Sequence, residues 1–84
     1  MEYRLLIDLE VVEQIQRLPR RARDDLLTHF HRIRDFPSRY ADFYEHDAIG
    51  RLVEISIFGL FAIHYWTDFA DRHVKILAFR PADA

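Results

Sequence analysis

The sequence predicts one small α+β domain of element order β-α-α-β-β-β, in which a helical hairpin packs on an antiparallel sheet. Three runs in its second half alternate apolar and polar residues, a pattern typical of strands joined by short turns. The first half instead repeats apolar residues at helical spacing on both sides of Leu18-Pro19. With 84 residues, half of them apolar, the chain can build one core, so we expect residues 1–84 to form a single domain.

The first half is expected to contain a strand followed by two helices. In residues 2–7, Tyr3, Leu5 and Ile7 alternate with Arg4 and Leu6, and this pattern predicts the strand. Asp8 stands where a helix N-cap would, and the spacing after it predicts a short helix ending near Arg17. Pro19 suits the first position of a second helix, which Phe36-Pro37 ends. The apolar residues that define the two helices are Val12, Ile15, Leu18, Leu26, Leu27, Phe30 and Ile33.

The second half is expected to contain a loop and then a sheet. Residues 37–50 show no clean period, so they predict a connecting loop. The alternating runs over 51–58, 60–67 and 73–79 predict a three-stranded antiparallel meander. Gly59 lies between the first two strands, where a tight turn favours positive φ.

Alternation divides the side chains of these three strands between two faces. The apolar face is expected to lie under the helices and comprises Val53, Ile55, Ile57, Phe61, Ile63, Tyr65, Val74, Ile76 and Ala78. The opposite face is expected to carry Glu54, Ser56, His64, Trp66, His73 and Lys75. Ile55, Ile63 and Ile76 occupy the middle of each strand and are predicted to be buried.

Composition excludes several classes of protein. The chain has no cysteine, which removes disulfides, thiolate nucleophiles and cysteine zinc sites. No run approaches the roughly 20 apolar residues of a membrane span, and no signal sequence is recognisable, so a cytoplasmic protein is expected. Two glycines are too few for a dinucleotide or Walker loop, and His29 and His31 diverge on a helix, so neither cofactor nor metal is expected.

Two groups of residues are candidates for function. Arg17, Arg20, Arg21 and Arg23 follow one another without an intervening acid and could contact phosphate or carboxylate groups, although a solvated helix face would also explain them. His64 is predicted to share a sheet face with Trp66, His73 and Lys75. Such a cluster could support acid–base chemistry, or it could be the polar face of an amphipathic sheet. The net charge of −2 argues against long-range attraction to nucleic acid.

The order and spacing of several short motifs resemble the RelE/ParE superfamily of bacterial type II toxin–antitoxin toxins over nearly the full chain. The motifs are Leu18-Pro19, Asp35-Phe36-Pro37, Gly50-Arg51, Gly59, Ile63-His64-Tyr65 and Val74-Lys75-Ile76-Leu77. The resemblance implies a fold like that of microbial ribonucleases and a toxin neutralised by a cognate antitoxin. RelE-like members cleave mRNA on the ribosome, whereas ParE-like members inhibit DNA gyrase.

The chain departs from the RelE-like nuclease pattern at two places. RelE-like nucleases tend to carry an arginine just after an aromatic residue in the strand that corresponds to residues 60–67, but here Ala62 follows Phe61. They often place a tyrosine or histidine after the last strand, but neither occurs in Arg80-Pro-Ala-Asp-Ala84. An mRNA interferase is the favoured hypothesis. A ParE-like gyrase inhibitor and a degenerate member that only binds its antitoxin stay open as alternatives.

The resemblance places basic residues at Arg51, Lys75 and, approximately, Arg80, whereas His64 is a candidate because of its predicted position on the sheet. If the chain cleaves RNA, Arg51 and Arg80 would hold the scissile phosphate, Lys75 would stabilise developing charge, and His64 or His73 would move protons. The arginines Arg17, Arg20, Arg21 and Arg23, together with Trp66 and His73, would contact RNA or the antitoxin. We expect the antitoxin segment to be largely helical and acidic.

Overall fold

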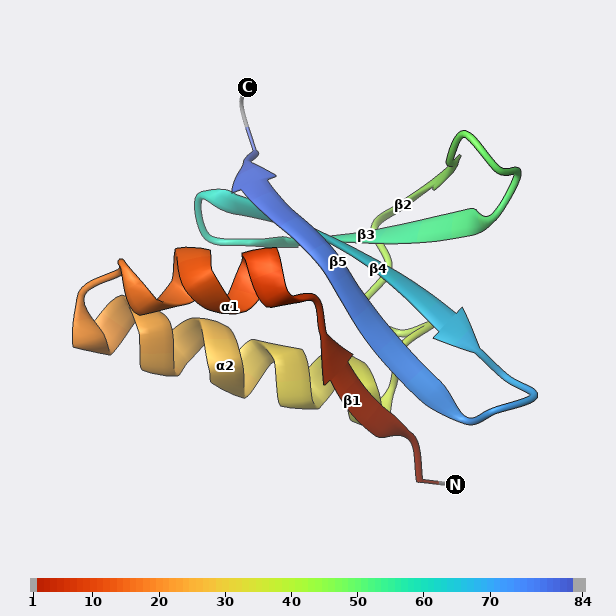
Figure 1. The fold of residues 1–84 in the computed structure, drawn as a ribbon, viewed down its shortest axis with the longest axis horizontal. Helices are drawn as coiled ribbons and strands as arrows, with labels where there is room; N and C mark the ends of the chain where they lie inside the picture. Colours follow the sequence, from red (N-terminus) through yellow and green to blue (C-terminus); the bar gives the residue numbers. More distant parts are fainter. Residues whose placement is uncertain (1, 83–84) are drawn as a thin grey trace.

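The computed structural model describes residues 2–82, so Met1, Asp83 and Ala84 lie outside the described residues. Two helices form one layer and a five-stranded sheet forms the other (Figure 1). The elements in chain order are β1 (Arg4–Ile7), α1 (Leu9–Gln16), α2 (Arg20–Asp35), β2 (Phe43–His46), β3 (Leu52–Phe58), β4 (Phe61–Asp68) and β5 (His73–Pro81). The predicted α+β class and helical hairpin are therefore confirmed.

The sheet has the strand order β1-β5-β4-β3-β2 and is mixed. The meander of β3, β4 and β5 is antiparallel, as predicted. β1, however, pairs in parallel with β5, with Arg4 opposite His73, so the expectation of a purely antiparallel sheet was wrong at this edge. The two helices between β1 and the meander make this parallel return possible, because a parallel neighbour requires a long crossover.

Part of the segment predicted to be a loop forms the edge strand β2. It pairs antiparallel with β3, with Phe43 opposite Ile55 and His46 opposite Leu52. All four residues of β2 are exposed. A strand that buries neither face needs no apolar alternation, and this explains why residues 37–50 gave no periodic signal.

The sequence analysis assigned the side chains of β3 to the wrong faces of the sheet. Glu54 pairs with Tyr65 and Ser56 with Ile63, which places both polar residues on the face covered by the helices. Ile55 pairs instead with His64 on the opposite face, called here the outer face, and is only half-buried. Val53 and Ile57 share that outer face.

Buried hydrogen bonds explain why β3 accepts polar groups on its inner side. The hydroxyl of Thr67 donates to Glu54 Oε1 over 2.6 Å, and Nε2 of His29 lies 3.0 Å from Ser56 Oγ. Burial raises the pKa of Glu54, while the bond from Thr67 opposes that rise. These pairs satisfy polar groups whose burial would otherwise be costly.

A β-bulge in β5 reverses the faces of its last residues. Ile76 is opposite Tyr65 whereas Ala78 is opposite His64, which leaves Leu77 as the extra residue. Ala78 therefore lies on the outer face, contrary to the prediction, and Phe79 enters the core. Arg80 follows on the outer face, opposite Ala62.

The core lies between the helices and the inner side of β1, β5 and β4. Ile63 and Ile76 are fully buried, as predicted, and both helices contribute apolar side chains to the same cluster. The buried cluster consists of Val11, Ile15, Leu26, Phe30, Ile33, Ile63, Tyr65, Val74, Ile76 and Phe79. Gly59 adopts φ +58° between β3 and β4, as a two-residue hairpin turn requires.

Candidate functional site

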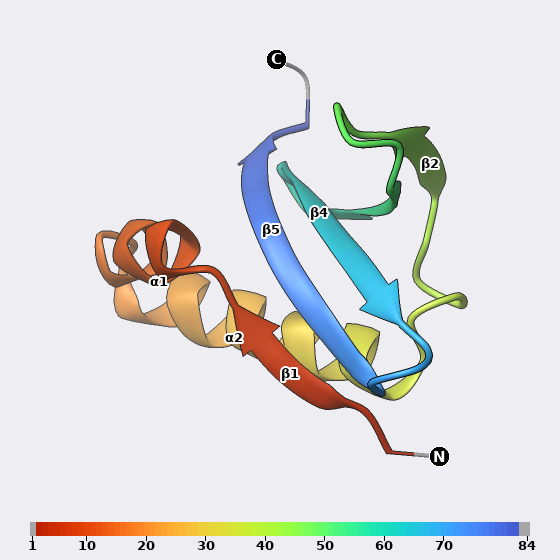
Figure 2. The same ribbon diagram turned by 45° about the vertical axis from the view of Figure 1, so that its right-hand side comes forward.

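The outer face of the sheet carries the candidate site. Figure 2 shows both helices on one side of the β4–β5 pair and β2 on the other. A groove of about 320 Å³ crosses this face from the end of β1 to the β2–β3 turn. It is lined by Asp8, Glu45, Asp47, Arg51, Val53, His64, Leu77, Ala78 and Arg80.

His64 lies in the middle of β4 and forms an acid–base pair with Glu45. The two side chains come from different strands, with His64 Nδ1 3.5 Å from Glu45 Oε1. Burial lowers the pKa of His64 below 6.5, the charge of Arg80 lowers it further, and Glu45 partly opposes both effects. The imidazole is therefore neutral at neutral pH, the form that accepts a proton.

Arg80 supplies a cation beside this pair. The bulge at Leu77 puts it on the outer face in the row of Ala62, one row from His64 along the strand. Arg80 is exposed, and among residues 2–82 no carboxylate pairs with it. Its guanidinium is therefore available to an anion in the groove.

Arg51 is the second arginine of the groove and is held in place on two sides. Its Nε donates to Asp47 Oδ2 over 2.8 Å, and its Cζ lies 5.0 Å from the ring centroid of Trp66. Oδ1 of Asp47 also accepts from the backbone N–H groups of Ile49 and Arg51. Desolvation tends to raise the pKa of Asp47, but these hydrogen bonds outweigh it and lower that pKa.

Lys75 and His73, also predicted for this site, lie on the outer face but outside the groove lining. Lys75 is opposite Trp66. Nδ1 of His73 lies 2.7 Å from Asp71 Oδ2, and its ring meets Trp66 edge-on at 5.6 Å. His73, the first residue of β5, is thus held by contacts at the β4–β5 turn and not in the groove.

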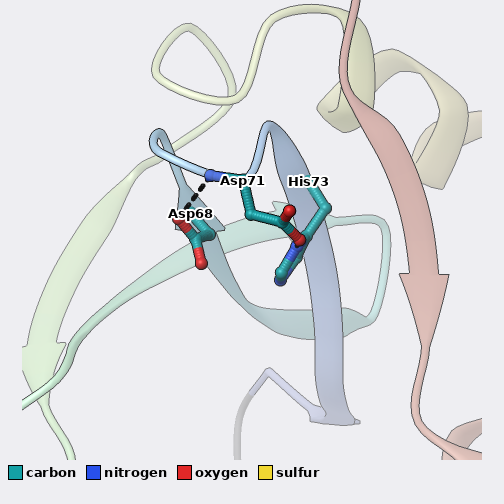
Figure 3. A group of neighbouring side chains, drawn as sticks. All are labelled: Asp68, Asp71 and His73. Atoms are coloured by element: carbon teal, nitrogen blue, oxygen red, sulfur yellow. Dashed lines mark hydrogen bonds and ion pairs between the residues drawn. The ribbon is translucent and has the colours of Figure 1, made fainter.

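That turn gathers three possible metal ligands, Asp68, Asp71 and His73, with ligand atoms within 4.8 Å of one another (Figure 3). Their oxygens already have partners. Asp68 accepts from the backbone N–H of Asp71, and Asp71 accepts from Arg4 over 2.7 Å. The charge of Arg4 offsets that of Asp71, and this ion pair joins the turn to β1.

The arginines of the first helical region do not join the groove. Arg17 caps α1, and Arg20, Arg21 and Arg23 occupy the first turn of α2. Figure 1 shows this joint and β2 at opposite ends of the molecule. Arg20 Nε lies 3.9 Å from Asp24 Oδ2 and both side chains are highly exposed, so this ion pair contributes little to the stability of the fold.

Two groove residues, Glu45 and Asp47, were missed by the sequence analysis. Both lie in the segment interpreted as a loop, where the absence of apolar alternation left no signal for the strand that carries Glu45. A second hollow, of about 410 Å³, lies between Tyr3 and the end of α2. Its lining contains no histidine, and its arginine, Arg34, pairs with Asp35 at 3.0 Å, so the outer-face groove is the better candidate.

These features define an α+β fold with two helices on a five-stranded mixed sheet, and comparison with solved structures shows that it is the RelE fold. The chain superposes on archaeal RelE of the RelE–RelB complex from Pyrococcus horikoshii with a TM-score of 0.80, 24% identity and 96% coverage of both chains. It matches the Mycobacterium tuberculosis toxin–antitoxin complex RelBE2 with a TM-score of 0.82, 15% identity, and coverage of 96% of this chain and 99% of that one.

A third similar structure is a mutant of the Escherichia coli toxin RelE in the free state, with a TM-score of 0.72, 13% identity, and coverage of 99% of this chain and 86% of that one. No protein-family model matches the sequence, and no curated protein matches it either. The resemblance identified from the motifs is thus confirmed at the level of the fold. Within residues 2–82, no helix is both long and apolar enough to cross a membrane.

Proposed function

We propose that this protein is the toxin of a toxin–antitoxin pair and acts as a RelE-like endoribonuclease. The observation that carries the proposal is the pairing of His64 with Glu45 in a groove that also contains Arg51 and Arg80, on the outer face of a RelE fold. A proton acceptor and two cations are what 2′-hydroxyl attack on a neighbouring phosphate requires.

The groove residues have distinct roles in the proposed reaction. Glu45 accepts the Nδ1–H of His64, which leaves the Nε2 lone pair free to take the proton of the ribose 2′-hydroxyl. The 2′-oxygen forms a bond to phosphorus as the bond to the 5′-oxygen breaks, giving a 2′,3′-cyclic phosphate. Water in the open groove protonates the departing 5′-oxygen. Arg80 and Arg51 stabilise the negative charge on the non-bridging oxygens.

Arg80 can also take the place of the arginine that RelE-like nucleases carry on the strand that is β4 here. Ala62 occupies that position, and Arg80 is its direct partner on β5. Side chains of directly opposed residues lie about 5 Å apart at Cβ, so a cation on β5 serves nearly the same space as one on β4. The small side chain of Ala62 leaves room for it.

The partner proposed for this toxin is a cognate antitoxin. Two of the similar structures are toxin–antitoxin complexes, one of RelE with RelB and the other of RelBE2. The exposed arginines Arg17, Arg20 and Arg21 form a surface that suits an acidic antitoxin segment. Binding at such a surface weakens as salt rises.

Induction of the chain in a bacterial host, with mapping of mRNA 5′ ends on ribosomes, tests the proposal. We expect growth arrest together with new 5′ ends inside coding regions, and the loss of both in His64→Ala. Arrest without new ends would replace cleavage by a binding mode of toxicity, such as gyrase inhibition. A folded protein that does not arrest growth would instead indicate a family member that only binds its antitoxin.

A further inference from the structure

The geometry points to a preformed oxoanion clamp made by Asp47, Arg51 and Trp66, in which Asp47 is a positioning residue for the guanidinium that receives an RNA phosphate. This inference rests on the proposed function, because it takes the phosphate of single-stranded RNA as the ligand. It adds a specific binding element and assigns a task to the sole tryptophan of the chain.

The clamp fixes each part of Arg51 except the edge that binds anions. Asp47 engages Nε from one side and Trp66 covers the face of the guanidinium. Among residues 2–82, no hydrogen bond or ion pair involves either Nη atom of Arg51. The two Nη groups are donors in a planar fork that matches two oxygens of a phosphate.

The anchoring carboxylate is itself fixed by the backbone. Asp47 Oδ1 accepts from the N–H groups of Ile49 at 3.1 Å and of Arg51 at 2.9 Å, while Oδ2 holds Nε. The side chain of Arg51 is 30% exposed and that of Asp47 24% exposed, so solvent reaches the pair only in part. A guanidinium held in this way loses less conformational entropy when it binds, because its rotamer is already chosen.

The location of the clamp favours a phosphate over a carboxylate of a partner protein. Arg51 lines the same groove as Arg80, with His64 also in the lining. A single-stranded nucleic acid along the groove would place its scissile phosphate between the two arginines. Trp66 beside Arg51 adds an aromatic ring, the usual companion of cations in sites for single strands.

Trp66 makes the clamp measurable, since all tryptophan fluorescence of the protein arises beside Arg51. The probe is a single-stranded RNA oligonucleotide with 2′-O-methyl groups, which binds but lacks the attacking hydroxyl. We expect it to change the fluorescence of the full chain in a saturable, salt-dependent manner. Asp47→Asn keeps the oxygen that accepts from the backbone but loses the ionic contact to Nε, and should weaken binding about tenfold with an unchanged melting temperature.

Two further variants separate positioning from charge and from general structural effects. Arg51→Lys keeps the charge but removes the fork, and is expected to weaken binding as much as Asp47→Asn. Asp35→Asn is the matched control, because Asp35 also pairs with an arginine, Arg34, but lies outside the groove. This control should bind the oligonucleotide as the unmodified chain does.

Each outcome decides between the clamp and the cleavage proposal. An unchanged affinity in Asp47→Asn, or no fluorescence response of the unmodified chain, overturns the clamp even if new mRNA ends appear in cells. Binding that depends on Asp47 without any mRNA cleavage keeps the clamp and rejects the nuclease. A response to an acidic peptide but not to the oligonucleotide also overturns the inference, since the ligand would then be a protein.

Discussion

At the residue scale, the Glu45–His64 pair makes a specific prediction about pH. Because the pKa of His64 is lowered, the rate of RNA cleavage should stay constant down to a pH below 6.5 and then fall as the imidazole takes a proton. Glu45→Gln removes the contact that raises this pKa, so the fall should move to lower pH while the plateau rate drops about 10²-fold or more. Cleavage rates on programmed ribosomes over a pH series provide the measurement. A pH profile that is identical in Glu45→Gln would show that the two residues do not act together.

A second residue-scale prediction concerns the buried His29. Its ring stacks on Phe58 at 4.3 Å and its Nε2 lies 3.0 Å from Ser56 Oγ, while Nδ1 is buried and has no hydrogen-bond partner among residues 2–82. Burial lowers the pKa of His29, the charge of Arg32 adds to this, and Asp42 opposes it. A folded-state pKa below the unfolded value of 6.5 means that the unfolded chain binds the proton more tightly, so stability falls as pH drops below 6.5.

Melting temperatures at about pH 7.5 and about pH 5.5 measure this effect. Replacing both partners by apolar groups, with His29→Phe and Ser56→Ala, should reduce the loss of stability between these two pH values. Glu54 changes the pH dependence of stability in the opposite direction, because its pKa is raised and its protonation favours the folded state. This effect is common to the unmodified protein and the double variant, so it cancels when the two are compared. An equal loss in both proteins would assign the acid sensitivity to other groups.

At the scale of the elements, two isoleucines of adjacent strands test the corrected faces of the sheet. Ile63 is fully buried under the helices, whereas Ile55 lies half-buried on the outer face. Ile63→Asp should unfold the domain because it buries an unpaired charge, and Ile55→Asp should leave it folded with a modest decrease in melting temperature. Circular dichroism and thermal melts of the two variants are sufficient. If both variants unfold, Ile55 contributes to the core as the alternation first predicted.

The same strands show how far sequence can predict this fold and its site. Helical spacing around Leu18-Pro19 and the alternation in the last three strands predicted the helices and the meander, because burial there follows a regular period. The phase of β3 could not be predicted, since its buried Glu54 and Ser56 depend on Thr67 and His29, which only the tertiary structure brings near. The bulge at Leu77 likewise could not be predicted, because no residue pattern in the sequence signals it. The placement of Arg80 in the groove depends on that bulge.

At the scale of the whole molecule, the arginines at the α1–α2 joint lie outside the groove on the outer face, so antitoxin binding and toxicity should be separable. Arg21→Glu with Arg23→Glu changes the surface at the α1–α2 joint and should weaken binding to the antitoxin while growth arrest persists. The control, Arg32→Glu with Arg39→Glu, makes the same change of charge away from that joint. Co-purification with the product of the neighbouring gene and growth curves report the two properties independently. Loss of growth arrest in the first variant alone would mean that the joint also contacts the target.

The pairing of β1 with β5 has a consequence for the synthesis of the protein. β1 is synthesised before the other four strands, yet within residues 2–82 its neighbour in the sheet is β5, which is synthesised after them. A nascent chain that ends before His73 therefore lacks the strand that lies between β1 and β4, and with it the core residues Val74, Ile76 and Phe79. Because such long-range pairing forms late, the groove, which needs Arg80 from β5, is assembled only after β5 has been synthesised. Incomplete chains should thus be inert, and the folding of the last strand sets the moment at which the protein becomes active.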